Sequence, residues 1–425
     1  MALSGNMFIF TEMKQAELIN RLTTESVELL KEMIAIPSPS FSEEAVCSHI
    51  SGWMKSKGIA HTRAGNNIIA GDITDGSGSA LMLCAHIDTV SPSEGYGFDP
   101  YKPDYEEAAR IINAVTGREC DPGDIVAGLG SNDDGASVVA MIAAYRYFLN
   151  IPGGAGMQNN PSHSFVVGPA PCGQGGSTVL HTTGTTGNAV HPDLILVLTC
   201  EEERSGKNGM TGLWPELTSK VGSAIIGEPT GMKAATSERG LLVIDAVAHG
   251  ISGHAARNEG RNALYIALDD INKLRNHTFS KISPRMGKVN LNVTQINAGT
   301  VHNVIPETCS FVIDIRPTEQ YSNEEILQEL QSICESELKP RNLTNRSSAT
   351  AEDSALLRAA EATGLETFSS PTTSDWMRVS CDAIKMGPGE SSRSHKKDEF
   401  VFVDEIRNGI ETYIELIRQY EHTLE

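Results

Sequence analysis

The sequence predicts an α/β protein in which helices flank a mixed, largely parallel sheet and a small α+β sandwich is inserted into the larger domain. Short apolar runs alternate with helical patterns up to Glu228, and strands that alternate with helices form parallel sheets covered on both faces. After Glu228 the order becomes β-α-β-β-α, which is typical of a compact α+β sandwich. The chain has 425 residues, enough for two to three domains of about 150 residues each.

The first half of the chain supplies helices and the strands of the predicted sheet. Residues 14–35 carry helix-forming residues with apolar spacings of three and four, and this pattern ends before Pro37. The next helix spans residues 42–57 and ends at Gly58, a residue type that commonly terminates helices. The elements that follow are strands at residues 67–70, 80–85, 194–199 and 224–226 and a helix at residues 137–149.

The second half contains the predicted insertion and then returns to the larger domain. Its elements are strands at residues 241–248, 288–297 and 308–315 and helices at residues 262–275 and 323–338. The α/β pattern resumes near Ser354, and a long helix over residues 404–420 closes the chain. We therefore expect the larger domain to comprise residues 14–232 and 345–425, and the inserted domain to comprise residues 233–344.

Two segments of the larger domain fit neither pattern. Residues 101–125 are polar and acidic, and residues 151–192 are rich in Gly, Ser, Thr, Asn and Pro without apolar periodicity. Segments of this kind are usually surface insertions, so we expect both to be flexible. The second contains His163, His181 and His191, whose spacing is too loose for a metal site, so we expect them to be loop histidines.

The composition excludes several classes of partner. The chain has 34 Lys plus Arg against 54 Asp plus Glu, a net charge of -20, whereas nucleic acids and anionic membranes require a basic surface. Apolar runs of transmembrane length do not occur, and the start of the chain lacks the basic region of a signal peptide. The eight cysteines form no C-x-x-C pair, which favours reduced thiols and a cytoplasmic location.

Candidate metal ligands follow the first apolar strand and a glycine turn. The strand at residues 80–85 runs into His86 and Asp88, and a histidine there can bind a metal while a carboxylate two residues on holds its other ring nitrogen. A histidine at a strand end is also often merely hydrogen-bonded. Asp133 and Asp134 follow Gly130 and precede an apolar helix, where they could cap the helix or bridge two cations.

Three further motifs carry carboxylates or a histidine. Glu201, Glu202 and Glu203 directly follow a buried strand, where like charges raise one another's pKa and call for a cation. Glu228 follows another apolar strand, and His395 follows a Gly-Pro-Gly turn in a polar loop, where a lone histidine would usually be inert. Taken together, these residues suit zinc, with manganese or cobalt as substitutes. Five ligands exceed the three that one catalytic zinc requires, so a pair of metals sharing a carboxylate explains the number.

These motifs resemble those of the co-catalytic zinc aminohydrolases, the family of acetylornithine deacetylase, succinyl-diaminopimelate desuccinylase, the aminoacylases and related carboxypeptidases and dipeptidases. The resemblance implies a zinc-exopeptidase-like catalytic domain with an inserted dimerisation domain, a homodimer, and two Zn²⁺ per subunit. It assigns His86 and Glu228 to one metal, Glu203 and His395 to the other, and Asp133 to the bridge. The remaining roles are orientation of His86 by Asp88, general base catalysis by Glu202, and a flanking position for Glu201; the offset from Gly130 favours Asp133 over Asp134.

The resemblance also implies functional residues in the inserted domain. His254 follows Gly253 and would reach the active site of the partner subunit, where it would stabilise the oxyanion. It could instead only serve a strand-to-helix turn. Asn303 and Arg316 resemble elements that grip the substrate carboxylate, although Arg316 could also pair with Asp314 or Glu319.

The reaction implied by the resemblance is hydrolysis of the amide bond of an N-acyl amino acid. The run from Gly253 and the run from Gly128 are closest to the acetylornithine deacetylase branch, which favours N-acetylornithine or a related N-acyl ornithine or citrulline in arginine biosynthesis. A metallo-dipeptidase, a carboxypeptidase or a succinyl-diaminopimelate desuccinylase is the alternative on the same scaffold. An inactive binding or regulatory homologue is the alternative of another class.

Overall fold

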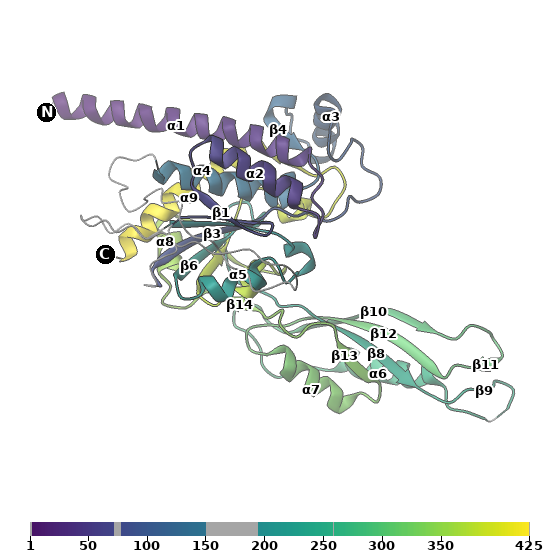
Figure 1. Ribbon diagram of the computed structural model, residues 1–425. Helices are drawn as coiled ribbons and strands as arrows, with labels where there is room; N and C mark the ends of the chain where they lie inside the picture. Colours follow the sequence, from purple (N-terminus) through teal and green to yellow (C-terminus); the bar gives the residue numbers. More distant parts are fainter. Residues whose placement is uncertain (1, 72–77, 150–193, 258, 425) are drawn as a thin grey trace, which may run out of the picture. The chain divides into compact units, whose positions relative to one another are not determined.

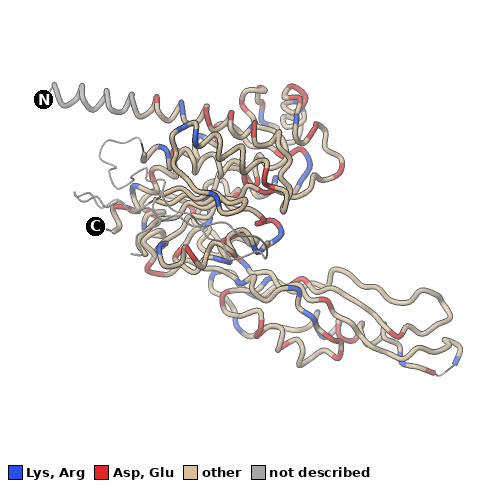
Figure 2. Tube along the Cα trace, viewed as in Figure 1, with Lys and Arg blue, Asp and Glu red and all other residues tan. Residues whose placement is uncertain are grey.

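The computed structural model describes residues 2–71, 78–149, 194–257 and 259–424 (Figure 1). The chain divides into two compact units. The large unit comprises Met1–Ala235, Thr350–Thr367 and Val379–Glu425, and the small unit comprises Thr236–Ala349 and Phe368–Arg378. Acidic and basic residues are interspersed along both units, so the net charge of -20 does not come from a single acidic tail (Figure 2).

The large unit is built on a mixed sheet with a parallel centre. Strands β5, β3, β6 and β16 are neighbours in that order and run parallel, while β1, β2 and β7 pair antiparallel at either end. The predicted α/β class with a largely parallel sheet is thus confirmed. The strands are β1 (His61–Ala64), β2 (Asn67–Ala70), β3 (Ala80–His86), β5 (Leu194–Thr199), β6 (Val221–Ile226), β16 (Asp382–Lys385) and β7 (Ala234–Glu238), whose last three residues belong to the small unit.

Helices cover the sheet of the large unit. On one face, Leu81, Leu83 and Ala85 of β3 belong to the same hydrophobic core as residues of α1, α2, α4, α8 and α9. Helix α4 is apolar on every side, and all its residues from Ala136 to Phe148 are buried, as expected for a helix enclosed by others. The helices are α1 (Ala2–Ile34), α2 (Glu44–Ser56), α4 (Ala136–Leu149), α5 (Met210–Leu217), α8 (Ala355–Ala362) and α9 (Val403–Leu424), and α1 begins well before the predicted residue 14.

The segment at residues 101–125 is folded, and its prediction as a flexible insertion is wrong. It contains helix α3 (Tyr105–Thr116), capped by Asp104, whose side chain accepts hydrogen bonds from the N–H groups of Glu106 and Glu107 at 3.0 and 3.3 Å. The buried face of α3 packs on the two-stranded antiparallel sheet of β4 (Ile125–Ala127) and β17 (Phe400–Phe402). The acidic residues that suggested a loop form the outer face of an amphipathic helix.

The second predicted insertion, residues 151–192, lies outside the described residues, together with His163, His181 and His191. The described residues contain no helix long and apolar enough to cross a membrane.

The small unit is an antiparallel sheet with two helices, which agrees with the predicted α+β sandwich. Its four strands are β8 (Leu242–His249), β10 (Asn290–Ala298), β12 (Thr308–Arg316) and β13 (Glu337–Pro340), in the order β10-β12-β8-β13. Alternate residues of β8, such as Leu242 and Ile244, pack with helices α6 (Ala263–Asn276) and α7 (Asn323–Ile333). Strand β9 (Gly253–His254) pairs with β11 (Val304–Ile305). Strands β14 (Ser348–Ala349) and β15 (Thr367–Ser370) each pair with β7.

One predicted boundary in the small unit is wrong. The helix predicted over residues 323–338 ends at Ile333, and Leu338 lies in strand β13 opposite Ala246 of β8. A local apolar pattern cannot reveal this change, because the strand is stabilised by pairing with a segment about ninety residues earlier in the chain.

Candidate metal centre

Side chains from three neighbouring strands meet at one edge of the central sheet. His86 is the last residue of β3, Glu202 and Glu203 follow β5, and Glu228 follows β6. Because β5, β3 and β6 run parallel, their carboxyl ends share the edge at which ligands gather in open α/β sheets. Asp133 from the turn before α4 and His395 from the loop before β17 complete a cluster of six residues, here named the carboxylate–histidine cluster.

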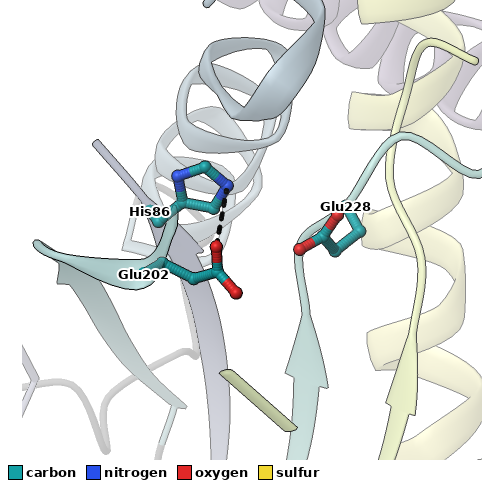
Figure 3. A group of neighbouring side chains, drawn as sticks. All are labelled: His86, Glu202 and Glu228. Atoms are coloured by element: carbon teal, nitrogen blue, oxygen red, sulfur yellow. Dashed lines mark ion pairs between the residues drawn. The ribbon is translucent and has the colours of Figure 1, made fainter. Parts of the chain in front are cut away.

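Figure 3 shows the part of the cluster that lies over the strand ends. The side chains of His86, Glu202 and Glu228 project from neighbouring segments toward a common space, and Nε2 of His86 lies 4.0 Å from Oε2 of Glu202. Each of these residues offers a ligand atom within 4.8 Å of those of the others. The same holds for the group of His86, Asp133 and Glu203. Two potential metal positions therefore share residues within one cluster.

Asp133 faces both histidines of the cluster. Its Oδ1 lies 3.2 Å from Nε2 of His86, and its Oδ2 lies 3.6 Å from Nε2 of His395. His395 in turn lies 2.9 Å from Oε2 of Glu203. A carboxylate that presents one oxygen to each side is arranged as a bridge between two cation positions.

Asp88 supports the cluster from two directions. The carbonyl oxygen of Asp88 lies 3.0 Å from Nδ1 of His86, and its carboxylate lies 3.5 Å from the same atom. The carboxylate also accepts hydrogen bonds from the N–H groups of Glu202 and Glu203, at 3.0 and 3.1 Å, and from the hydroxyl of Ser40 at 2.7 Å. Asp88 thus fixes the backbone of the Glu202–Glu203 turn by hydrogen bonds and also contacts the His86 ring.

The two acidic neighbours of the proposed ligands point elsewhere. The Glu201 carboxylate accepts hydrogen bonds from the backbone and side chain of Asn208, at 3.0 and 2.6 Å. Asp134 accepts a hydrogen bond from the N–H of His86 at 3.4 Å, and burial raises the pKa of Asp134 to about 8. Neither residue belongs to the candidate metal-binding groups among the described residues.

The pKa values of the cluster reflect crowded negative charge. Burial raises the pKa of Glu228 well above its ordinary value, and the Asp133 carboxylate adds to the effect. Burial would lower the pKa of His86, but its hydrogen bonds to Asp133 and Asp88 outweigh this and hold the pKa well above the usual range. The hydrogen bond to Glu203 raises the pKa of His395 to about 9. Protonated histidines therefore balance the carboxylates.

The donor set fits divalent metal ions. Four carboxylates and two imidazoles converge, and the raised pKa values of Glu228 and Glu203, both owed first to burial, indicate a place where positive charge is needed. A metal ion bound here would meet this need in place of the protons on the histidines. Mixed imidazole and carboxylate ligands suit zinc, cobalt and manganese.

Two buried carboxylates that the sequence did not single out support the cluster. Glu43 is 0% exposed and accepts a hydrogen bond from the N–H of Glu201 at 3.1 Å. Glu399 is 2% exposed and accepts hydrogen bonds from the N–H groups of Asn132 and Asp133, at 2.9 Å each. In the sequence, each is an acidic residue in a polar segment, which is indistinguishable from a solvated charge. Only the position of Glu399, four residues after His395, is a signal.

The other predicted site residues belong to the small unit. His254 is exposed, and its Nδ1 accepts a hydrogen bond from the N–H of Ala256 at 3.1 Å. The carbonyl of Asn303, also exposed, accepts one from the N–H of Ala255 at 3.0 Å, so the two residues lie in adjoining segments. Arg316 forms a two-fold ion pair with Asp314, at 2.8 and 3.1 Å, the first of the alternatives open from the sequence.

Comparisons with known proteins agree with this geometry. Residues 236–342 match the M20 peptidase dimerisation domain. The chain is 27% identical to acetylornithine deacetylase of Myxococcus xanthus over 233 residues, which span 50% of this chain and 61% of that relative. It is 24% identical to acetylornithine deacetylase of Proteus mirabilis (88% and 91% covered) and 22% identical to succinyl-diaminopimelate desuccinylase of Corynebacterium glutamicum (69% and 67% covered).

Solved structures share the fold. A metallo-carboxypeptidase of the M20 family from Sulfolobus solfataricus has a TM-score of 0.66 at 14% identity, covering 94% of this chain and 99% of its own. A dinuclear metal-binding peptidase of the same family from Bacillus subtilis has a TM-score of 0.62 at 14% identity, covering 94% and 98%. The matched dimerisation domain, the relatives and the shared fold all support the resemblance to the zinc aminohydrolases, the family that includes acetylornithine deacetylase, succinyl-diaminopimelate desuccinylase and the M20 peptidases.

Proposed function

We propose that this protein hydrolyses the amide bond of an N-acyl amino acid with two divalent metal ions held in the carboxylate–histidine cluster. The observation that carries the proposal is the position of Asp133, with one carboxylate oxygen toward His86 and the other toward His395. His86 and Glu228 would hold one metal, Glu203 and His395 the other, and Asp133 would contact both. When bound, such ions polarise an amide carbonyl and lower the pKa of water.

Glu202 is the proposed general base. Its backbone N–H donates a hydrogen bond to the Asp88 carboxylate at 3.0 Å. Its own carboxylate lies at the carboxyl edge of the parallel strands, 4.0 Å from Nε2 of His86. From there it can accept the proton of the water that attacks the amide carbonyl and then donate that proton to the leaving amine. Its side chain is only 10% exposed, which limits competition from bulk water.

The residues of the small unit complete the proposal. The matched dimerisation domain supports a homodimer, in which His254 of one subunit would stabilise the oxyanion in the site of the other. Asn303 and Arg316 would bind the substrate carboxylate. Because the Arg316 guanidinium is already engaged by Asp314, it would have to exchange or share that ion pair when substrate binds.

We propose that the substrate is N-acetylornithine or a related N-acyl ornithine or citrulline, as in arginine biosynthesis. We also propose that the protein acts in the cytoplasm. The acetylornithine deacetylases among the relatives support this choice. The relative named as a succinyl-diaminopimelate desuccinylase and the peptidases that share the fold support the alternatives: N-succinyl-diaminopimelate, or a dipeptide or peptide C-terminus.

A turnover panel tests the proposal. The protein loaded with Zn²⁺, Co²⁺ or Mn²⁺ is assayed on N-acetylornithine, N-acetylcitrulline, N-succinyl-diaminopimelate and a set of dipeptides, and the metal content is measured on the same sample. The expected result is a kcat/KM highest for N-acetylornithine or N-acetylcitrulline. A dipeptide preferred by tenfold or more would favour the peptidase alternative, and metal binding without turnover would favour a binding homologue.

A further inference from the structure

Two segments far apart in the chain clasp one another beside the carboxylate–histidine cluster. The first is the turn at residues 130–135, which carries Asp133, and the second is the segment at residues 387–399, which carries His395. Backbone and side-chain hydrogen bonds join them in both directions, and the N–H of Gly128 also donates to the carbonyl of Glu399 at 2.9 Å. We call this pair of segments the clasp.

The Glu399 carboxylate, from the second segment, binds the backbone of the first. Its Oε1 accepts hydrogen bonds from two successive backbone N–H groups, those of Asn132 and Asp133, at 2.9 Å each. Glu399 is 2% exposed, so solvent offers these donors no substitute if the carboxylate is removed. Glu399 belongs to neither of the two candidate metal-binding groups among the described residues.

The Asn132 side chain, from the first segment, binds the backbone of the second. Its Oδ1 accepts a hydrogen bond from the N–H of Glu390 at 2.9 Å, and its Nδ2 donates to the carbonyl of Glu390 at 3.2 Å. Gly389 allows this approach: a Cβ there would lie 2.3 Å from Oδ1 of Asn132, and its φ of +85° is one that glycine adopts readily. The contacts of Asn132 thus fix the beginning of the segment that leads to His395.

The clasp joins neighbours of the two residues that meet in the cluster. Asn132 directly precedes Asp133, and Glu399 follows His395 by four residues. Asp133 and His395 approach to 3.6 Å, although they are more than 250 residues apart in sequence. Any loosening of the clasp would change the separation of these side chains, on which a shared metal site depends.

We infer that Glu399 is a positioning residue that holds the Asp133 turn against the His395 segment and so presets the separation of two metal ligands. This inference rests on the proposed function for the identity of the ligands, but the clasp itself does not depend on it. Partners that orient metal ligands typically change metal affinity by about 10- to 100-fold when they are removed.

The test compares three variants at position 399 with one control. Glu399→Leu removes both acceptor oxygens at similar size, Glu399→Gln keeps a carbonyl oxygen in place, and Glu399→Asp keeps the carboxyl group but shortens the reach. The control is Asp382→Leu. Asp382 is a carboxylate of the large unit that accepts hydrogen bonds from the N–H of Ala351, at 3.1 Å, and from the hydroxyl of Ser354.

Two readouts separate positioning from general stability. Hydrogen exchange of the Asn132 and Asp133 amides, measured without metal, reports the clasp, and titration with Zn²⁺ or Co²⁺ alone against a competing chelator reports the ligands. In Glu399→Leu and Glu399→Asp we expect exchange to be at least about tenfold faster and metal affinity about 10- to 100-fold lower. Glu399→Gln should keep both properties. Asp382→Leu should lower the unfolding midpoint and leave both unchanged.

Each contrary outcome has a definite reading. Wild-type metal affinity in Glu399→Asp or Glu399→Leu, despite faster exchange, would overturn the positioning role, as would unchanged exchange in these variants. Loss of metal in Glu399→Gln with protected amides would also overturn the positioning role, because the carboxyl group would then act other than through these hydrogen bonds. If the wild-type protein binds no metal, the proposed function fails, while faster exchange in the variants would still support the clasp and unchanged exchange would refute it. The Asp variant keeps a polar side chain, so it covers the case in which Leu prevents folding.

Discussion

The Asp133 carboxylate separates two histidines: its Oδ1 lies 3.2 Å from Nε2 of His86 and its Oδ2 lies 3.6 Å from Nε2 of His395. The first prediction follows from this position. Asp133→Ala should lower the metal content from two ions per subunit to one or none and abolish turnover, because both proposed metal positions lose a shared ligand. Elemental analysis after dialysis measures the content.

Asp134→Asn is the matched control for the bridge. Burial raises the pKa of Asp134 to about 8, so the group is mainly neutral at pH 7 and an amide of the same shape replaces it closely. This variant should retain its metal. If Asp134→Asn loses metal and Asp133→Ala does not, the bridge belongs to Asp134 instead.

The second prediction concerns the general base. Glu202→Gln should keep both metals but lose about 10² to 10⁴ in kcat, because an amide cannot accept the proton of the attacking water. Metal analysis and steady-state kinetics on the same preparation decide the matter. A variant that loses metal would identify Glu202 as a ligand, which its place in a group with His86 and Glu228 allows.

The third prediction is metal dependence. A chelator should inactivate the protein, and Zn²⁺, Co²⁺ or Mn²⁺ should restore activity, because the clustered donors suit these ions. The affinity for metal should rise with pH, because the histidines then release the protons that compete with metal for their ring nitrogens. Full turnover by a sample shown to be metal-free would contradict the mechanism.

The fourth prediction tests action across a dimer. His254→Ala and Glu202→Gln should each be inactive, and co-expression of the two should restore up to roughly a quarter of the sites, because some heterodimers contain one site with both wild-type residues. The heterodimer is verified by different tags on the two chains. Verified heterodimers without activity would place the action of His254 within its own chain or confine it to folding.

The fifth prediction concerns the stability of the small unit. Asp270 accepts hydrogen bonds from the N–H groups of Glu335 and Ser336, and from the Ser336 hydroxyl at 2.7 Å. Burial would raise the pKa of Asp270, but hydrogen bonds from Lys273 and Ser336 outweigh it and lower the pKa below its ordinary value of 3.8. Asp270→Asn should therefore destabilise the protein by about 1–3 kcal/mol at pH 7.

The sign of the pH dependence follows from the lowered pKa. A carboxylate whose pKa is lower in the folded state stabilises the fold above its unfolded pKa, and this contribution is lost as the pH falls through the folded pKa. The stability difference between wild type and Asp270→Asn should be constant from pH 7 to about 4 and shrink below that, as measured by urea unfolding. Asp269→Asn, an exposed neighbour, should show a much smaller effect at every pH.

The sequence by itself determined the central strands, most helices and the residues that end the strands. An apolar run such as residues 194–199 specifies a buried strand through its own composition, and a carboxylate or histidine directly after it must lie at the sheet edge. His86, Glu202, Glu203 and Glu228 could be identified for this reason. Their roles, and those of His254, Asn303 and Arg316, stay predictions until the variants are measured.

Only the tertiary structure decided which distant groups support these residues. The hydrogen bonds from the backbone of Asn132 and Asp133 to Glu399 span more than 260 residues, and the strand at Leu338 exists because β8 offers it an unpaired edge. The amphipathic helix over Tyr105–Thr116 likewise has its buried face defined by β4 and β17, the second of which lies near the end of the chain. Local periodicity and composition carry no information about such partners, because the stabilising contacts arise only when separate segments pack together.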